Sequence, residues 1–343
     1  LSLLALNSGQ ALIIALAITV MLLLAADGVV EKQLTLGDFA MVNAYMLQLF
    51  LPLNFLGFVY REIRRALTDL ENMLGLLKRR PVIADAADAQ PLQLADGVIE
   101  FKDVHFAYQA ERPILKGLSF IVRPGQKLAV VGSSGAGKST ISRLLYRFYD
   151  IQQGTISIDQ QSITELTLDS LRQAIAIVPQ DTVLFNTSIR ENIAYGNPSA
   201  SESDIDRAIE LAHLRPFIAS LPQGDQTLVG ERGLKVSGGE KQRIAIARVL
   251  LKRSKVLVFD EATSALDSHT EQSILQAIRE VSVGHTSIVI AHRLSTIIDA
   301  DQIIVLDQGV VIETGRHDDL LAQGGVYAAM WALQQQETTV TLD

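Results

Sequence analysis

Residues 132–140, GSSGAGKST, have the types and spacing of a loop that binds the phosphates of a nucleoside triphosphate. An apolar stretch at 128–131 precedes the loop, and a helix-like stretch begins at Ile141, so the pattern predicts a strand, a loop and a helix. Glycines let the backbone turn tightly and direct N–H groups at phosphate oxygens. Lys138 is predicted to reach the β- and γ-phosphates, and the Ser139 hydroxyl to hold Mg²⁺. The predicted phosphate-binding residues are Gly132, Ser133, Ser134, Gly135, Ala136, Gly137, Lys138, Ser139 and Thr140.

Two carboxylates end the stretch VLVFDE, residues 256–261, which has the pattern of a buried strand. A carboxylate at the end of such a strand can hold Mg²⁺ through water, and this role suits Asp260. Glu261 is expected to face the γ-phosphate and to position or deprotonate the attacking water. A solvated acidic turn is the alternative interpretation. The strand and the upstream loop favour the catalytic one.

The stretch VSGGEKQR, residues 236–243, precedes a helical pattern and predicts a second anion site. Ser237, Gly238 and Gly239 can offer a hydroxyl and backbone N–H groups at a helix N-terminus. Alone, this stretch would be an ordinary N-cap turn. One chain has no second triphosphate for it, so the expected ligand is the nucleotide bound by another copy of the chain.

The composition limits the partners that the protein can have. The net charge of −8 argues against a general nucleic-acid binder, and we expect no nucleic-acid partner. The absence of cysteine excludes disulfides, thiolate metal sites and thiol nucleophiles. The 48% hydrophobic content is high for a chain that is 20% charged, and the apolar excess lies in the first sixty residues. The sequence opens inside an apolar run without a methionine, so we expect it to be the C-terminal piece of a longer polypeptide.

Two apolar stretches, at about 1–26 and 39–60, carry no charged residue and predict two transmembrane helices. A basic cluster beginning at Arg61 follows the second stretch and predicts that this span ends in the cytoplasm. Two buried helices of a soluble core are the alternative, although charge-free stretches of this length are rare in soluble folds. Residues 1–80 are therefore predicted to belong to a transmembrane domain, and the alanine- and aspartate-rich residues 81–96 to form a linker.

The remaining residues, 97–343, are predicted to form a soluble α/β domain. Alternating apolar residues at 98–108 and the turn at Pro124 predict β-strands ahead of the phosphate loop. After the loop, strand-like and helix-like segments alternate, as in a fold with a mainly parallel sheet.

Together these motifs resemble the nucleotide-binding domain of an ABC transporter, over residues 97 to about 336. The resemblance implies a parallel sheet core, an antiparallel β subdomain and a helical subdomain, with ATP and Mg²⁺ as ligands. It also implies that the Tyr108 ring stacks on adenine, and that Gln180, in VPQD, contacts Mg²⁺ and reports the nucleotide state to the membrane part. Asp267, in SALD, would lie along a dimer seam, and His292, in IAHRLST, would contact the γ-phosphate.

The implied reaction is in-line attack of water on the γ-phosphate, with ATP joining two copies of the chain. The predicted catalytic residues are Glu261, His292, Lys138 and Gln180, and the predicted Mg²⁺ ligands are Ser139, Gln180 and Asp260. The stretch VGERG, 229–233, resembles the cross-talk segment of exporters. Val236 and Glu240 depart from the leucine and glutamine usual in the family. Neither replaces a phosphate donor, so we expect activity to survive.

The membrane part resembles one group of exporters. The stretches LNSGQ, 6–10, and PLNFLGFVYREIRRAL, 52–67, are similar to the mitochondrial iron–sulfur-linked half-transporters and their bacterial heavy-metal and glutathione-conjugate relatives. That resemblance implies a homodimer in a lipid membrane that exports a small molecule, such as a glutathione conjugate or a metal–thiol compound. It favours a multi-pass protein of a bacterial inner membrane over one of the mitochondrial inner membrane. Such half-transporters normally have six spans, of which only two are visible here.

Asn7 and Gln10 lie three residues apart on one face of the first predicted span, where polar groups usually face a cavity or a partner helix. By the resemblance they would bind the substrate, together with Asn54, Phe55 and Gly57 of the second span. Hydrogen bonding between helices is the alternative role. For the whole protein, a lipid or drug exporter and a soluble ABC-type ATPase with an apolar partner-binding arm are the alternatives.

Overall fold

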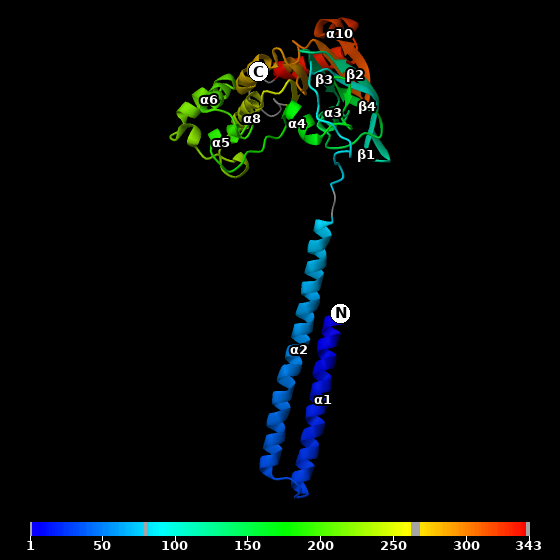
Figure 1. Ribbon diagram of the computed structural model, residues 1–343, viewed down its shortest axis with the longest axis vertical. Helices are drawn as coiled ribbons and strands as arrows, with labels where there is room; N and C mark the ends of the chain where they lie inside the picture. The colour runs from blue at the N-terminus through cyan, green and yellow to red at the C-terminus, as the bar shows by residue number, and fades with distance from the viewer. Residues whose placement is uncertain (1, 79–80, 262–267, 341–343) are drawn as a thin grey trace. The chain divides into compact units, whose positions relative to one another are not determined.

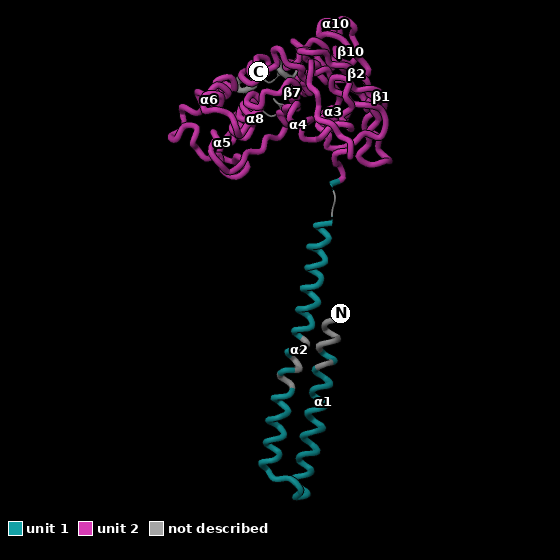
Figure 2. Tube along the Cα trace, viewed as in Figure 1, with its two compact units in different colours: residues 1–81 teal, residues 82–343 magenta. Residues whose placement is uncertain are grey.

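The sequence changes from apolar to mixed composition near Pro81, and the computed structural model divides there into two units, Leu1–Pro81 and Val82–Asp343 (Figure 2). The structure describes residues 2–78, 81–261 and 268–340.

The first unit is a pair of helices, α1 (Ser2–Val30) and α2 (Leu36–Leu77), joined by a short turn (Figure 1). A capping box starts α2, because the Thr35 hydroxyl accepts from the Asp38 N–H at 3.1 Å while the Asp38 carboxylate accepts from the Thr35 N–H at 2.8 Å. The segment Ala11–Val30 has a mean hydropathy of 2.5 and is long enough to cross a membrane. The other predicted span, 39–60, lies within α2, and six of its side chains fall outside the described residues, so it stays a prediction.

A six-stranded sheet forms the centre of the second unit, in the order β10-β9-β3-β8-β7-β6. The strands β9, β3, β8, β7 and β6 are parallel, and β10 is antiparallel to β9. Strands β3, β7 and β8 are almost entirely buried, as expected for a parallel sheet covered on both faces. The bounds are β3 Lys127–Gly132, β6 Ile175–Val178, β7 Val256–Asp260, β8 Thr286–Ile290, β9 Gln302–Asp307 and β10 Val310–Gly315.

A second, antiparallel sheet has the order β2-β1-β4-β5. Its strands are β1 Ile99–Gln109, β2 Arg112–Val122, β4 Gln153–Ile158 and β5 Gln161–Ser162. Alternating residues of β1 are buried, which fits the apolar alternation in the sequence.

The helices form two groups around the parallel sheet. One group, α5 (Ile189–Ala194), α6 (Glu202–Leu211), α7 (Arg215–Ser220) and α8 (Gly238–Lys252), forms a helical lobe at one side of the second unit (Figure 1). The others are α3 Lys138–Leu145, α4 Leu168–Ala174, α9 Ser268–Ser282, α10 His317–Gln323 and α11 Val326–Val340. Short 3₁₀ turns lie at Gly224–Gln226, Glu231–Gly233 and Leu294–Thr296.

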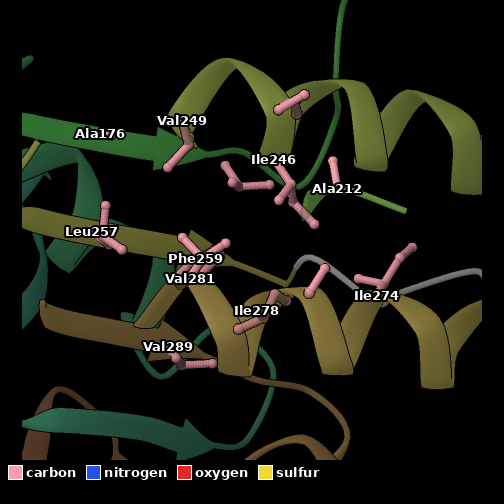
Figure 3. Packing of buried hydrophobic residues seen from close by; sticks show 14 of the residues in the cluster. Ala176, Ala212, Ile246, Val249, Leu257, Phe259, Ile274, Ile278, Val281 and Val289 are labelled. Atoms are coloured by element: carbon pink, nitrogen blue, oxygen red, sulfur yellow. The ribbon is translucent and has the colours of Figure 1, made fainter. Parts of the chain in front are cut away.

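Two hydrophobic cores cover the two faces of the parallel sheet. Leu257 and Phe259 of β7 belong to one core, and Val256 and Val258 to the other, because successive side chains of a strand point to opposite faces. In the first core, residues of α8 and α9 pack over Phe259 (Figure 3). The second core lies between the two sheets and α3. The predicted architecture, an α/β domain with a parallel sheet core, an antiparallel sheet and a helical lobe, is confirmed.

Residues 81–96 were predicted as a linker. Of these, 82–96 contain no helix or extended strand but are hydrogen-bonded within the second unit. The Gln90 N–H donates to Glu165 O at 2.9 Å, and Gln90 O accepts from the Thr167 N–H at 3.0 Å. The Asp159 carboxylate accepts from the Ala95 N–H at 2.8 Å. These bonds join residues more than sixty positions apart, so the composition of the segment gave no sign of them.

Candidate active site

The phosphate loop connects the end of β3 to the start of α3 and requires glycine at two of its positions. Gly132 has φ of +148°, and a Cβ there would lie 2.1 Å from the Leu306 carbonyl oxygen. Gly137 has φ of +104°, and a Cβ there would lie 2.8 Å from a methyl group of Leu115. Only glycine combines these conformations with such close approach. The loop is therefore shaped by the two sheets that it passes between.

Lys138 lies at the start of α3 with its side chain almost fully buried. Its Nζ donates hydrogen bonds to Gly132 O at 2.8 Å and Ser133 O at 3.0 Å, so the ammonium group lies across the loop. Burial lowers the pKa of Lys138, and the facing carboxylates of Glu261 and Asp260 oppose that effect. The ammonium group is thus a partly desolvated cation beside the loop, where a phosphate can exchange for the loop carbonyls.

Asp260 ends β7 and faces two hydroxyls of α3. The Ser139 Oγ donates to Asp260 Oδ1 at 3.1 Å, and the Ser142 Oγ donates to Asp260 Oδ2 at 2.8 Å. Sequence reasoning brought Asp260 and Ser139 to one site but missed Ser142. The signal was available, because Ser142 follows Ser139 by three residues and so lies on the same face of the helix.

Glu261 and Gln180 meet at the same edge of the sheet. Gln180 follows β6, and its Nε2 donates to Glu261 Oε2 at 2.6 Å. Glu261 has φ of +47°, and its N–H donates to Ile290 O at 2.9 Å, which ties it to the end of β8. The parallel register puts the carboxyl ends of β6, β7 and β8 side by side.

Tyr108 lies in β1, and its hydroxyl is 3.3 Å from Thr140 Oγ1 of the phosphate loop. The Arg143 guanidinium donates to the Tyr108 hydroxyl at 3.1 Å, and the Tyr149 ring packs against the Tyr108 ring at a centroid distance of 5.0 Å. An aromatic ring at the side of the phosphate loop is suited to stack on a nucleobase. Arg143 and Tyr149, which hold that ring, were not predicted.

Ser237 is the N-cap of α8 and forms a capping box with Glu240. The Glu240 N–H donates to Ser237 Oγ at 3.4 Å, and the Ser237 N–H donates to Glu240 Oε2 at 2.9 Å. The Arg243 guanidinium lies 3.5 Å from the second carboxylate oxygen of Glu240. Gly238 and Gly239 form the first turn of the helix, so the predicted anion-binding N–H groups stand at a helix N-terminus. Glu240, which replaces the glutamine usual in the family, thus forms the capping box, and either residue can do so.

His292 follows β8, and its side chain is exposed. It lies two residues beyond Ile290, whose carbonyl binds Glu261, and so belongs to the same edge of the sheet. The loop that carries it is bonded to Gln334 of α11, a contact that the sequence did not suggest.

The remaining predicted residues are placed less completely. Asp267 lies outside the described residues. Asn7 and Gln10 lie in α1, and Asn54 and Gly57 in α2, but their side chains are outside the described part of the structure. Phe55 of α2 is 65% exposed, and its ring centroid is 6.2 Å from that of Phe58. All five belong to the first unit, whereas the phosphate loop belongs to the second.

Residues 115–264, which contain the phosphate loop, Ser237 and Asp260, match the model of the ABC transporter family. The chain belongs to this family. Its resemblance to the mitochondrial iron–sulfur-linked half-transporters and their bacterial relatives is also confirmed by the proteins described next.

The chain is 50% identical over 341 residues to the mitochondrial iron–sulfur clusters transporter atm1 of Aspergillus fumigatus, covering 98% of this chain and 47% of the relative. It is 50% identical over 339 residues to human ATP-binding cassette sub-family B member 6, covering 98% of this chain and 40% of that protein. A bacterial Atm1-family ABC exporter with ATP bound matches with a TM-score of 0.77 and 52% identity, over 97% of this chain and 58% of the other. The chain thus spans less than half the length of these two curated relatives.

Proposed function

We propose that the chain is the ATPase domain, with two adjoining membrane helices, of an ABC exporter that uses ATP hydrolysis to move a small molecule across a membrane. The observation that carries the proposal is the edge of the parallel sheet. There Asp260 faces Ser139 of the phosphate loop, and Glu261 is paired with Gln180. This arrangement brings a phosphate cradle, oxygen ligands and a carboxylate base to one place.

The oxygens of Ser139, Gln180 and Asp260 suit a hard divalent cation, so these residues fit the predicted Mg²⁺. When bound, Mg²⁺ supplies charge neutralisation to the β- and γ-phosphates. The loop N–H groups and Lys138 bind the phosphates, and Tyr108 stacks on adenine. Glu261 accepts a proton from the attacking water, and Gln180 holds the Glu261 carboxylate in place until the nucleotide binds.

A second copy of the chain completes each site in this proposal. Ser237 and Gly239 of one copy donate to the γ-phosphate held by the other, as the helix N-terminus allows. ATP then joins two copies, and hydrolysis separates them. The apolar segment Ala11–Val30 is consistent with a membrane protein. We place it in a bacterial inner membrane, consistent with the bacterial exporter among the matched structures.

The proposed substrate is a glutathione conjugate, a metal–thiol compound or a related small molecule. The supporting observation is the similarity to proteins named as iron–sulfur clusters transporters, together with the polar residues Asn7 and Gln10 in an otherwise apolar helix. Replacing both with alanine is expected to abolish the stimulation of ATPase activity by glutathione in the full-length protein. Unchanged stimulation would contradict this substrate site.

The ATPase proposal is tested by phosphate release from the purified full-length protein. Activity that needs Mg²⁺ and is lost in the variant Lys138→Ala is the expected result. Absence of ATP hydrolysis in a protein that binds ATP would refute the proposal. Stimulation by lipids or hydrophobic drugs instead of thiol compounds would support the other exporter class, and solubility of the full chain without detergent would contradict a membrane protein.

A further inference from the structure

The side-chain amide of Gln334, in the C-terminal helix α11, makes two hydrogen bonds to the loop that carries His292. Its Nε2 donates to His292 O at 2.8 Å, and its Oε1 accepts from the Leu294 N–H at 2.8 Å. The amide therefore bonds the main chain on both sides of Arg293. A side chain that only donates or only accepts could make one of these bonds, and asparagine would be one methylene shorter.

The position of Gln334 is fixed by other contacts of α11. Tyr327, Met330, Trp331 and Gln334 have the spacing i, i+3, i+4 and i+7, so they lie on one face of the helix. Tyr327 is fully buried, and its hydroxyl is 2.6 Å from His317 Nδ1. Met330 and Trp331 pack against the core cluster on one face of the parallel sheet. This face holds the helix against the sheet independently of the Gln334 amide.

The loop itself is held at both ends, with His292 between. The Ala291 N–H donates to Val130 O at 3.1 Å, which ties the loop to the strand before the phosphate loop. Leu294 is fully buried in the same core cluster that α11 covers. His292 is the exposed residue between these two buried ones. The Gln334 amide therefore bonds the main chain beside His292, where the side chain is exposed to solvent.

We propose that Gln334 is a positioning residue for the ATPase reaction, which fixes the backbone at His292 so that the imidazole is directed at the γ-phosphate. This inference rests on the proposed function and on the γ-phosphate contact that the family resemblance implies for His292. Helix α11 lies outside the 115–264 segment matched by the family model, and the proposal assigns this helix a part in catalysis. Gln334 does not itself touch the nucleotide in this scheme, so its loss lowers kcat and leaves ATP binding to the loop and Tyr108 unchanged.

The first test compares Gln334→Leu and Gln334→Glu with the matched control Gln336→Leu in the full-length protein. Gln336 is an exposed residue of the same helix. We expect kcat for ATP hydrolysis to fall about tenfold in Gln334→Leu, since small displacements of a catalytic group cost that much or more. The KM for ATP and the affinity for a fluorescent ATP analogue should stay within about twofold, which also shows that the variants are folded. Gln334→Glu keeps the acceptor for Leu294 and loses the donor to His292, and it should show an intermediate loss.

The second test asks whether the effect passes through His292. In a double-mutant cycle, Gln334→Leu should cost nothing further in a His292→Ala background, because the positioned group is gone. Hydrogen–deuterium exchange of the peptide spanning 291–297 should be faster in Gln334→Leu and unchanged in Gln336→Leu. An unchanged kcat or unchanged exchange in Gln334→Leu would overturn the proposal, and so would the same tenfold loss in the His292→Ala background. Absence of ATPase activity in the unmodified protein would instead refute the proposed function.

Discussion

Removing the hydroxyl of Ser142 tests how Asp260 is held for the Mg²⁺-binding role that we propose for it. Ser142 is 2% exposed, and its Oγ lies 2.8 Å from Asp260 Oδ2 and 2.9 Å from Ser139 O. One hydroxyl carries one proton, so it can donate to only one of these acceptors at a time. The bond to the carboxylate is assisted by charge and is the stronger of the two. Ser142→Ala removes that bond without adding a group.

A hydrogen bond to an ionised group contributes about 1.5–3 kcal/mol. The Ser139 hydroxyl still holds Oδ1 in the variant, so we take the lower end of that range. A loss of about 1.5 kcal/mol corresponds to roughly tenfold in a dissociation constant. We therefore expect Ser142→Ala to weaken the binding of ATP with Mg²⁺ about tenfold. Binding of ATP without Mg²⁺ depends on Lys138 and the loop, and it should change less than about twofold.

The assay is titration with a fluorescent ATP analogue in the presence of Mg²⁺ and then of a chelator. Ser282→Ala is the matched control, because Ser282 is a buried serine of α9 whose Oγ donates to Ile278 O, in the same way that helical serines bond their own backbone. It should leave the ratio of the two affinities unchanged. Equal losses with and without Mg²⁺ in Ser142→Ala, or no loss at all, would refute the assigned role.

Three further predictions concern catalysis, packing and pH. Glu261→Gln should lower ATP hydrolysis by about 10²–10⁴-fold with ATP affinity retained, measured by phosphate release and analogue binding; an active variant would exclude Glu261 as the base. Gly309→Ala should lower the free energy of unfolding by about 3 kcal/mol, because Gly309 has φ of +86° and a Cβ there would lie 2.1 Å from Ile114 O. Gly284→Ala should lower it by only about 1 kcal/mol, because Gly284 has φ of +76° but open space around the Cβ position. Equal thermal midpoints for the two glycine variants would contradict this packing argument. Burial, together with nearby Asp318, raises the pKa of Tyr327 to about 12. The unfolded value is about 10, so the stability that this group contributes is fully present below about pH 10 and is lost as the pH rises through about 12. Thermal unfolding of Tyr327→Phe should lack that part of the pH dependence, and identical profiles would contradict it.

The parts of the site that were predictable are those that depend on local pattern. The phosphate loop follows from nine consecutive residues and their flanks, because glycine conformation and helix start are local properties. The meeting of Asp260 with Ser139 follows from parallel strand topology, which puts strand ends at one edge. The capping box of Ser237 and Glu240 is likewise a four-residue pattern.

The parts that could not be predicted depend on contacts between distant residues of ordinary type. Gln334 is one of three consecutive glutamines in a helix that begins at Val326, 34 residues after His292, and nothing in the sequence shows which loop its amide bonds. The contacts of Arg143 and Tyr149 with Tyr108 could not be predicted for the same reason. An arginine in a helix and a tyrosine in the loop after it are usually surface residues. Residues 82–96 have the composition of a free linker, and only the fold brings Asp159 and Glu165 to their backbone.

The cap of α8 has a consequence for how its first residue can be used. The Ser237 oxygen uses one lone pair to accept from the Glu240 N–H, and within the described residues its hydroxyl hydrogen makes no hydrogen bond. The Ser237 hydroxyl can therefore cap its own helix and, at the same time, donate a hydrogen bond to a phosphate oxygen of another molecule. No hydrogen bond of the helix cap has to break for this, so binding to a nucleotide would add a hydrogen bond without the loss of another. An aspartate at this position would cap equally well. It would nevertheless present only acceptors to an anion.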